Sequence, residues 1–316
     1  VVRGEVTFEN RTIEDFVLLR SSGLPVFLLS NAFDDASMGI THVVRGEDHV
    51  PGTPKYLLLR EALGLGRPEV FAHLPLLVNE QRKKLSKRKD SVSVGEFREA
   101  GYLPEAMVNY LALLGWGPKD DVEIRPLEEI VQLFRLEDVT PSPAFFDVKK
   151  LQSFNAEYVR QLSPEDFTSA VQPFLTRPGA LEALQPLAGL VQERVRLLTE
   201  VEPMIAFLLD GELEVDEASW AKAMKADVAP AMLDASAAAL EELGDWTAAG
   251  IRLAIEAAAV AVGLVNAEGQ PQLSKAQGPV RVATTGRSVG PPLFESLEAL
   301  GRDRTLERLR AARQRL

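Results

Sequence analysis

Apolar residues in the first ninety positions fall into short runs separated by polar turns. Val26–Ala32 has the length of a buried strand, Gly39–Val44 is rich in β-branched residues as in parallel strands buried on both faces, and Phe71–Val78 is a third strand-like run. A Thr-Pro pair marks the start of a helix over 53–63. The order strand, strand, helix, strand predicts an α/β unit with parallel pairing. Weaker apolar runs in 1–20 predict further short strands.

After residue 90 the apolar positions recur every three or four residues, which is typical of amphipathic helices. The helices predicted in this way are Val94–Ala100, Pro104–Leu114, Leu127–Phe134, Lys149–Gln161, Ala180–Glu200, Ala218–Lys225, Ala231–Leu243 and Thr247–Val265, with one more beginning at Ser163-Pro164. The predicted fold class is therefore α/β plus all-α, with part of an α/β domain followed by a long helical region.

Composition narrows the class of protein. The chain has 316 residues, enough for two or three domains, and it contains no cysteine, which excludes disulfides, cysteine-ligated zinc and a thiol nucleophile. No apolar run reaches the roughly 18 residues needed to cross a bilayer, and no leader-like segment opens the chain, so a cytoplasmic protein is expected. The first residue is Val rather than Met, so the chain is expected to be a piece of a longer protein.

Charge is distributed unevenly along the chain. The formal net charge is -11, which argues against non-specific binding of nucleic acid, but residues 201–260 alone carry twelve acidic and three basic side chains. By contrast, six basic side chains occupy eight positions at 82–89, and all three histidines lie in the first quarter. This pattern favours chemistry or phosphate binding in the first part and recognition in the second.

The basic segment 83–89, Lys-Lys-Leu-Ser-Lys-Arg-Lys, is the clearest candidate for chemistry. Flexible lysines with rotatable donors can bind phosphates and stabilise charge on a transferring nucleotide. A solvated basic loop is the alternative, and composition alone favours it. The segment follows a strand-like run at the edge of an α/β sheet, where nucleotides commonly bind, and this context favours the phosphate-binding interpretation.

Lys-Leu-Ser-Lys-Arg at 84–88 resembles the second signature motif of class I aminoacyl-tRNA synthetases, in the form used by the glutamyl group. Further segments resemble bacterial glutamyl-tRNA synthetases in the same order along nearly the whole chain. They are 34–49 (Asp-Asp to Glu-Asp-His), Thr53-Pro54-Lys55, 72–76, 101–116, Pro143 to Leu151, 155–160, 279–287 and 293–297.

The resemblance implies a glutamate–tRNA ligase that uses ATP, accompanied by Mg²⁺, to form glutamyl-adenylate and then charges tRNA(Glu). It implies that Lys87, supported by Lys84 and Arg88, stabilises the ATP phosphates. It also implies an ATP-binding set, which consists of Leu76, Leu77, Ser86, Lys87, Asp48 and His49. No metal-ligand spacing is present.

The same resemblance assigns three residues to the glutamate pocket. Arg45 matches the arginine that pairs with the substrate carboxylate, a role that suits a planar guanidinium; an ion pair with Glu47 or Asp48 is the alternative. Asn31 is a pocket donor or, alternatively, a cap of a local turn. Phe27 stands where the family usually has tyrosine, so the hydroxyl is missing and a direct hydrogen bond to glutamate is not expected.

In the helical part, Arg194 aligns with an arginine that reads the third anticodon base in discriminating family members, and a surface charge is the alternative. Trp220 and Trp246 lie in helical patterns and are expected in the core rather than as base-stacking platforms. His42 is also expected in the core, and His73 is expected to be structural.

The resemblance implies four regions: 1–22 as the tail of an acceptor-end insertion, 23–90 as the second half of a Rossmann-like catalytic domain, 91–160 as a stem-contact domain, and 161–316 as an anticodon-binding region. The His-x-Gly-His signature is absent. The chain alone is therefore expected to be inactive, and the intact enzyme to be monomeric. Alternatives are a non-catalytic tRNA-binding module and a glutaminyl-tRNA synthetase, although the latter usually has β-barrel anticodon domains.

Overall fold

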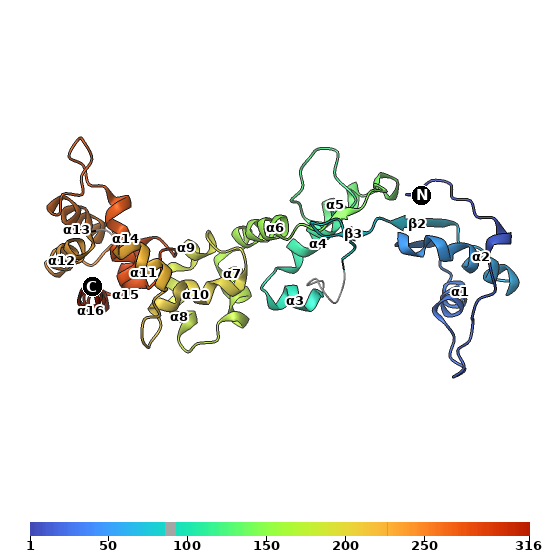
Figure 1. Cartoon of the computed structure of the whole chain (residues 1–316), viewed down its shortest axis with the longest axis horizontal. Coiled ribbons are helices and arrows are strands. Elements are labelled where there is room, and N and C mark those ends of the chain that lie inside the picture. Colours follow the sequence, from blue (N-terminus) through green and yellow to red (C-terminus); the bar gives the residue numbers. More distant parts are fainter. Residues whose placement is uncertain (86–92, 226) are drawn as a thin grey trace. The chain divides into compact units, whose positions relative to one another are not determined.

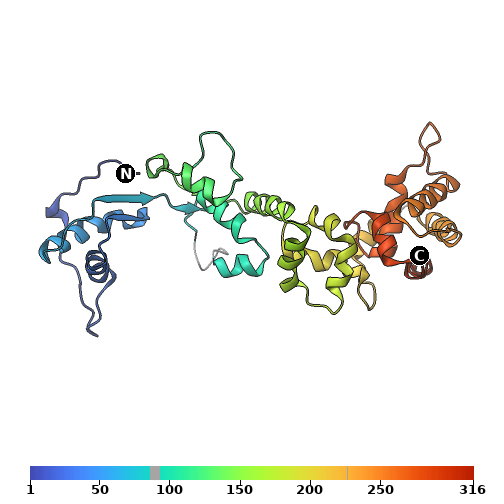
Figure 2. The same ribbon diagram turned by 180° about the vertical axis from the view of Figure 1, so that it is seen from behind.

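The computed structural model describes residues 1–85, 93–225 and 227–316, and Figures 1 and 2 show its ribbon from two sides. The chain divides into two compact units. Unit 1 contains Val1–Arg98 and Leu103–Phe154, and unit 2 contains Glu99–Tyr102 and Asn155–Leu316. The first unit carries the described strands, and the second is helical, as the predicted fold class requires.

A parallel strand pair is the centre of the α/β part of unit 1. Strand β1 (His42–Gly46) pairs with β2 (Val70–Leu74), and the helix α2 (Thr53–Ala62) connects them. In this register Arg45 lies opposite His73. The prediction of two parallel strands joined by a helix is confirmed.

The predicted first strand is wrong, because residues 27–37 form the helix α1 (Phe27–Ser37). Leu28, Leu29 and Ala32 recur with helical spacing and pack together with Tyr56 of α2. A seven-residue apolar run such as 26–32 fits either a strand or a helix, and in this chain packing against α2 favours the helix. The two helices are in contact, and both lie in the blue part of the chain in Figure 1.

Three other expectations about this region are also wrong. Residues 1–20 contain a short 3₁₀ helix, Asn10–Thr12, and a single bridge between Leu19 and Pro25 in place of the expected strands. Strand β1 is not buried on both faces, since Val43 is 8% exposed but Val44 is 46% exposed. His42 is exposed rather than in the core, because alternate side chains of a strand point to opposite faces.

The third predicted run forms two strands. β2 ends at Leu74, and β3 (Leu77–Val78) begins after Pro75, which lacks the N–H needed to continue a ladder. β3 pairs in parallel with β4 (Ala144–Phe145), a two-residue strand that the sequence analysis did not find. Behind β2, Ala72 packs in a core cluster with Trp116, Ile130 and Val139.

The helices predicted in the remainder of unit 1 are present. They are α3 (Val94–Glu99), α4 (Pro104–Ala112), α5 (Leu127–Leu133) and the start of α6 (Val148–Gln161), which continues into unit 2. The Tyr110 hydroxyl accepts the backbone N–H of Asp147 (2.6 Å), and burial raises the pKa of Tyr110 to about 12. This hydrogen bond ties α4 to the start of α6.

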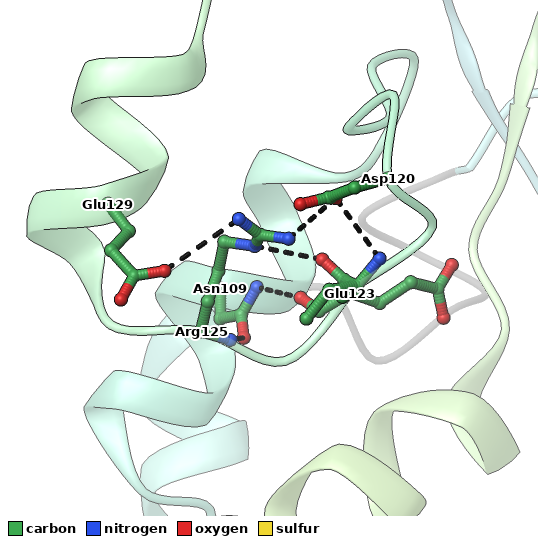
Figure 3. A network of polar contacts seen from close by, with 6 residues as sticks. Asn109, Asp120, Glu123, Arg125 and Glu129 are labelled. Atoms are coloured by element: carbon green, nitrogen blue, oxygen red, sulfur yellow. Dashed lines mark hydrogen bonds and ion pairs between the residues drawn. The ribbon is translucent and has the colours of Figure 1, made fainter.

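A buried arginine organises the loop between α4 and α5 (Figure 3). The Arg125 side chain donates to Asp120 (2.7 Å) and to the Val122 carbonyl (2.8 Å). Its backbone N–H donates to Asn109, whose amide donates in turn to the Glu123 carbonyl. These contacts satisfy the loop backbone from both sides.

The described helices of unit 2 have eight residues or fewer in its first half, whereas most of those in its second half have 13 or 14. The first group is α7 (Pro164–Val171), α8 (Ala180–Leu184), α9 (Ala188–Gln192), α10 (Val201–Ile205) and α11 (Glu217–Met224). The second group is α12 (Ala229–Glu241), α13 (Ala248–Ala261), α14 (Leu273–Thr285), α15 (Leu293–Leu300) and α16 (Arg302–Arg315). The predicted continuous helix 180–200 is broken by a 3₁₀ turn at Pro186 and by the segment 193–197.

Within the described residues, no helix combines the length and the low charge that spanning a membrane requires.

Candidate functional site

Arg45 is the centre of a polar cluster in unit 1. Its guanidinium donates through Nη2 to the Thr53 hydroxyl (3.0 Å), through Nε to His73 Nε2 (3.4 Å) and through Nη1 to the Asn31 side-chain oxygen (3.5 Å). It also lies 5.5 Å from the centre of the Tyr56 ring. The strand end, the start of α2 and helix α1 thus converge on one cation.

No described carboxylate forms an ion pair with this half-buried guanidinium. The two candidate partners named from sequence are engaged elsewhere: Glu47 pairs with Arg3, and Asp48 pairs with Lys84 (2.8 Å). Burial lowers the pKa of Arg45, and Tyr56 and Asp35 oppose that shift. A partly desolvated cation with only neutral hydrogen-bond partners is suited to bind the carboxylate of a ligand.

His73 and Thr53 hold the guanidinium in place. Thr53 Oγ1 donates to the His49 carbonyl (3.0 Å), which leaves its lone pairs for Arg45. Burial, and next the charge of Arg45, lower the pKa of His73, so the neutral ring can accept the Arg45 Nε–H through Nε2. The expected structural role of His73 has a specific form here, since the histidine orients a candidate ligand-binding arginine.

Asn31 is oriented by a second pair of residues. Its amide donates to Asp35 Oδ2 (3.1 Å), and the same oxygen accepts the Tyr56 hydroxyl (2.8 Å). Asp35 lies one helical turn after Asn31 in α1, which leaves the Asn31 side-chain oxygen directed at Arg45. Asp35, Tyr56 and Thr53 were not predicted as site residues. The spacing of four between Asn31 and Asp35 becomes a signal only once residues 27–37 are known to form a helix rather than the predicted strand.

Phe27 and His49 lie at the exposed side of this cluster. Phe27 is 62% exposed, and the centre of its ring is 5.5 Å from that of His49. A phenylalanine can offer this contact but no hydrogen bond. The structure therefore brings Phe27, Asn31, Arg45 and His49 together in one part of unit 1.

The start of the basic loop is attached to β3. Lys84 forms a bridge with Val78, and the backbone N–H of Leu85 donates to the Leu77 carbonyl (2.9 Å). The ammonium of Lys84 lies 2.8 Å from Asp48, and this hydrogen bond lowers the pKa of that carboxyl group. Of the basic-loop residues named from sequence, Ser86, Lys87 and Arg88 lie outside the described residues.

The backbone of Leu76 and Leu77 already has several partners. The Leu76 N–H donates to Glu47 Oε1 (3.3 Å), and its carbonyl accepts from Ala144 (3.0 Å). An adenine at this edge would exchange with these hydrogen bonds or use a remaining carbonyl lone pair. Adenine binding at Leu76 and Leu77 stays a prediction.

In unit 2, Arg194 projects from a turn that is fixed on both sides. Before it, Gln192 is buried and donates to the carbonyls of Val159 (2.8 Å) and Leu162 (2.9 Å). After it, Val195 is buried, and the Arg196 carbonyl accepts the Asn155 amide (2.5 Å). Arg194 itself is exposed and makes no ion pair with a described carboxylate.

Arg194 lines a cavity of about 850 Å³ together with a second exposed arginine, Arg287. Three acidic residues share the lining, but two of them are engaged: Glu200 accepts the N–H of Arg196 (2.7 Å), and Asp216 accepts that of Ser219 (2.8 Å). Neither arginine forms an ion pair with a carboxylate of the described residues, although Asp216 lies within electrostatic range of Arg287. Two exposed guanidinium groups at one cavity can bind a nucleotide.

The two tryptophans of unit 2 are half-buried rather than fully in the core, which corrects the expectation from sequence. Arg302 lies over the ring of Trp246 (5.4 Å), and Arg315 lies over that of Trp220 (4.2 Å). The Trp246 N–H donates to the Leu297 carbonyl (3.0 Å). Each ring therefore has an arginine of its own chain against one face.

No group of three or more His, Cys, Asp and Glu side chains in the described part of the chain is arranged to hold a metal ion.

Comparison with known families divides the chain as its fold does. Residues 1–153 match the catalytic domain of class I tRNA synthetases for glutamate and glutamine, and residues 166–313 match an anticodon-binding domain. A parallel α/β unit with a helical anticodon-binding domain defines the class as a class I aminoacyl-tRNA synthetase.

Individual relatives narrow the family further. The chain is 52% identical to the glutamate–tRNA ligase of Salinispora tropica, with 100% of this chain and 69% of the relative covered. It is 51% identical to that of Frankia casuarinae, of which it covers 67%. A crystal structure of a glutamate tRNA ligase from Elizabethkingia meningosepticum in complex with its amino acid is similar with a TM-score of 0.76 and 29% identity, covering 99% of this chain and 64% of that one. The chain belongs to the glutamate–tRNA ligase family and spans about two thirds of the length of these relatives.

Proposed function

We propose that this chain supplies the glutamate-binding arginine, the phosphate-binding loop and the anticodon-reading surface of a glutamate–tRNA ligase. The whole enzyme activates glutamate with ATP, accompanied by Mg²⁺, and transfers it to the 3′ end of tRNA(Glu). The observation that carries the proposal is the Arg45 guanidinium, which is held by Thr53, His73 and Asn31 and has no carboxylate partner.

We assign roles to individual residues as the family resemblance implies them, and the contacts of the described residues support the assignments to Arg45 and Asn31. Arg45 and Asn31 bind the glutamate, with Phe27 and His49 beside them. The basic loop is assigned the ATP phosphates, with Lys87 as the stabilising lysine and with Lys84, Ser86 and Arg88 in support. Lys84 is neutralised by Asp48 in the described structure, so ATP phosphates would compete with that carboxylate for the ammonium.

Arg194 is assigned to the third base of the anticodon, where a guanidinium can form two hydrogen bonds with one base edge. This assignment predicts an enzyme that charges tRNA(Glu) in preference to tRNA(Gln). We place the intact enzyme in the cytoplasm, where tRNA and ATP are available, and expect a monomer.

Because the chain spans about two thirds of its relatives, activity is tested on two proteins. One is the chain alone, and the other, called the joined ligase below, is the chain fused to the part of the Salinispora tropica enzyme that it does not span. We expect glutamate-dependent exchange between ATP and pyrophosphate from the joined ligase and none from the chain alone. A joined ligase that folds and binds tRNA(Glu) but shows no exchange would contradict the proposal.

That last result would favour the second candidate, a non-catalytic tRNA-binding module. The observation that favours a non-catalytic module is Phe27, because its ring is largely exposed and lacks a hydroxyl. Restoring the hydroxyl with Phe27→Tyr in the joined ligase separates the two candidates, because only an enzyme with a glutamate site at this position should change its KM for glutamate.

A further inference from the structure

A second cavity of about 430 Å³ lies next to the Arg194 cavity in unit 2. The two cavities share Ser219 and Ser288, and the Ser219 hydroxyl donates to that of Ser288 (3.0 Å). The hydroxyl pair therefore stands on the wall common to both cavities. The two cavities are therefore adjacent, and a chain-like ligand in the larger cavity would reach the edge of the smaller one.

The described lining of the smaller cavity contains three cations and no acidic residue. The cations are Lys222 on α11 and Lys275 and Arg281 on α14. Only Lys222 belongs to the acidic stretch 201–260, and the other two cations come from the C-terminal part of the chain. Because the whole chain has a net charge of -11, a cavity lined by cations alone favours a specific anionic ligand over a general attraction for nucleic acid.

The two lysines are the cations free to bind such a ligand. Neither ammonium pairs with a described carboxylate, and both side chains are exposed. Arg281 is partly committed, since it donates to the Pro291 carbonyl (2.7 Å) and lies within electrostatic range of Glu295. Lys222 and Lys275 are therefore the cations of this cavity that are available to an anion.

The position of Lys275 supports a ligand rather than a helix-stabilising role. It is the third residue of α14, where a cation faces the positive end of the helix dipole and lowers helix stability slightly. The preceding N-cap residue, Gln272, makes no capping hydrogen bond with its side chain. A phosphate at this point would be attracted by both the lysine and the helix terminus.

We propose that the smaller cavity binds the phosphodiester of a nucleotide adjacent to the anticodon bases, with Lys222 and Lys275 as its two cationic contacts. The inference rests on the proposed binding of an anticodon in the Arg194 cavity. It adds a backbone contact that fixes the register of the RNA, while Arg194 reads a base.

The test measures binding of a fluorescent anticodon stem-loop RNA of tRNA(Glu) to the full chain by anisotropy at several salt concentrations. For a single-stranded loop, each lost phosphate contact reduces the slope of log affinity against log salt by about 0.7. We expect Lys222→Ala and Lys275→Ala to reduce the slope by about 0.7 each and the double variant by about 1.4. Lys225→Ala is the matched control, because this exposed lysine lies one turn from Lys222 and does not line the cavity.

A second measurement locates the contacted phosphate. Stem-loops carrying one neutral methylphosphonate linkage at a time are bound to the wild-type chain and to the double variant. We expect one linkage beside the anticodon whose neutralisation weakens wild-type binding and has no effect on the double variant. Thermal melting of each variant controls for Lys222, which also lies in the last turn of α11.

The outcomes separate this inference from the proposed function. An unchanged salt slope in the double variant, with tight wild-type binding that Arg194→Ala abolishes, would overturn the phosphate contact alone. A wild-type chain that does not bind the stem-loop would overturn the proposed anticodon role and this inference together.

Discussion

The substitution Arg45→Lys tests the glutamate site most economically, because it keeps the charge and removes the fork of the guanidinium. In the structure three nitrogens of Arg45 donate to three different residues, at 3.0, 3.4 and 3.5 Å. A lysine ammonium is a compact point charge on a flexible stem and cannot reach Thr53 and His73 while also contacting a substrate carboxylate through two parallel hydrogen bonds.

The expected loss is one charge-assisted hydrogen bond to the substrate, which is worth about 1.5–3 kcal/mol. At about 1.4 kcal/mol for each factor of ten, this corresponds to roughly a 10- to 100-fold rise in the KM for glutamate. The KM for ATP should change little, because the described nucleotide-side residues Leu76 and Lys84 make no contact with Arg45.

The assay is glutamate-dependent exchange between ATP and pyrophosphate by the joined ligase, with glutamate and ATP varied separately. Arg20→Lys is the control, since Arg20 is exposed and its side chain makes no hydrogen bond or ion pair with the described residues. A KM for glutamate within twofold of the wild-type value, together with a lower melting temperature, would refute the substrate role and leave Arg45 as a structural residue.

Three further predictions concern the chain itself. Arg125→Ala should destabilise unit 1 by about 2–3 kcal/mol in urea unfolding, because it leaves the Val122 carbonyl without its donor and removes the buried aliphatic part of a side chain. Arg135→Ala, at an exposed arginine, should cost less than about 0.5 kcal/mol. Equal losses from the two substitutions would contradict the structural role of Arg125 shown in Figure 3. Gly286→Ala should lower the melting temperature and weaken stem-loop binding. The reason is that Gly286 has φ +75° and an added Cβ would meet the carbonyl of Glu214, a residue that lines the Arg194 cavity. A fully stable variant would show that this contact relaxes freely. The pKa of His73 is lowered by burial, so His73 binds fewer protons in the folded chain than in the unfolded chain. The free energy of unfolding should therefore fall as the pH drops below 6.5, the ordinary pKa of histidine. Urea midpoints at pH 7.5 and 5.5 should differ more in the wild type than in His73→Gln, and an equal difference would exclude His73 as the cause of the pH dependence.

Local patterns were sufficient for elements whose packing follows directly from sequence spacing. Helices such as α4 and α6 present apolar residues every three or four positions, and the β-branched run before Arg45 forms β1. The segment 26–32 failed because its apolar run fits either period, and only contacts with Tyr56 across the helix pair decide between them. The two-residue strand β4 has no pattern of its own and exists because β3 supplies its partner.

The candidate site shows the same division. Arg45 and Asn31 were named because the family motif contains them, but the residues that orient them come from distant parts of the chain. His73 reaches Arg45 through the register of β1 and β2, and Tyr56 reaches Asp35 across two helices. Such contacts depend on tertiary packing, which no local window of sequence contains. The smaller cavity of unit 2 could not be predicted for the same reason. Lys222 and Lys275 are 53 positions apart in the chain, and neither belongs to a recognisable motif in its own helix.

A crystal structure of the joined ligase with bound glutamate would show whether Arg45 binds the substrate. We expect a substrate carboxylate bound by two parallel hydrogen bonds to the Arg45 guanidinium, at about 2.7–2.9 Å, with His73 and Thr53 still in contact with Arg45. Glutamate bound elsewhere, with Arg45 paired instead to a carboxylate of the protein, would contradict it.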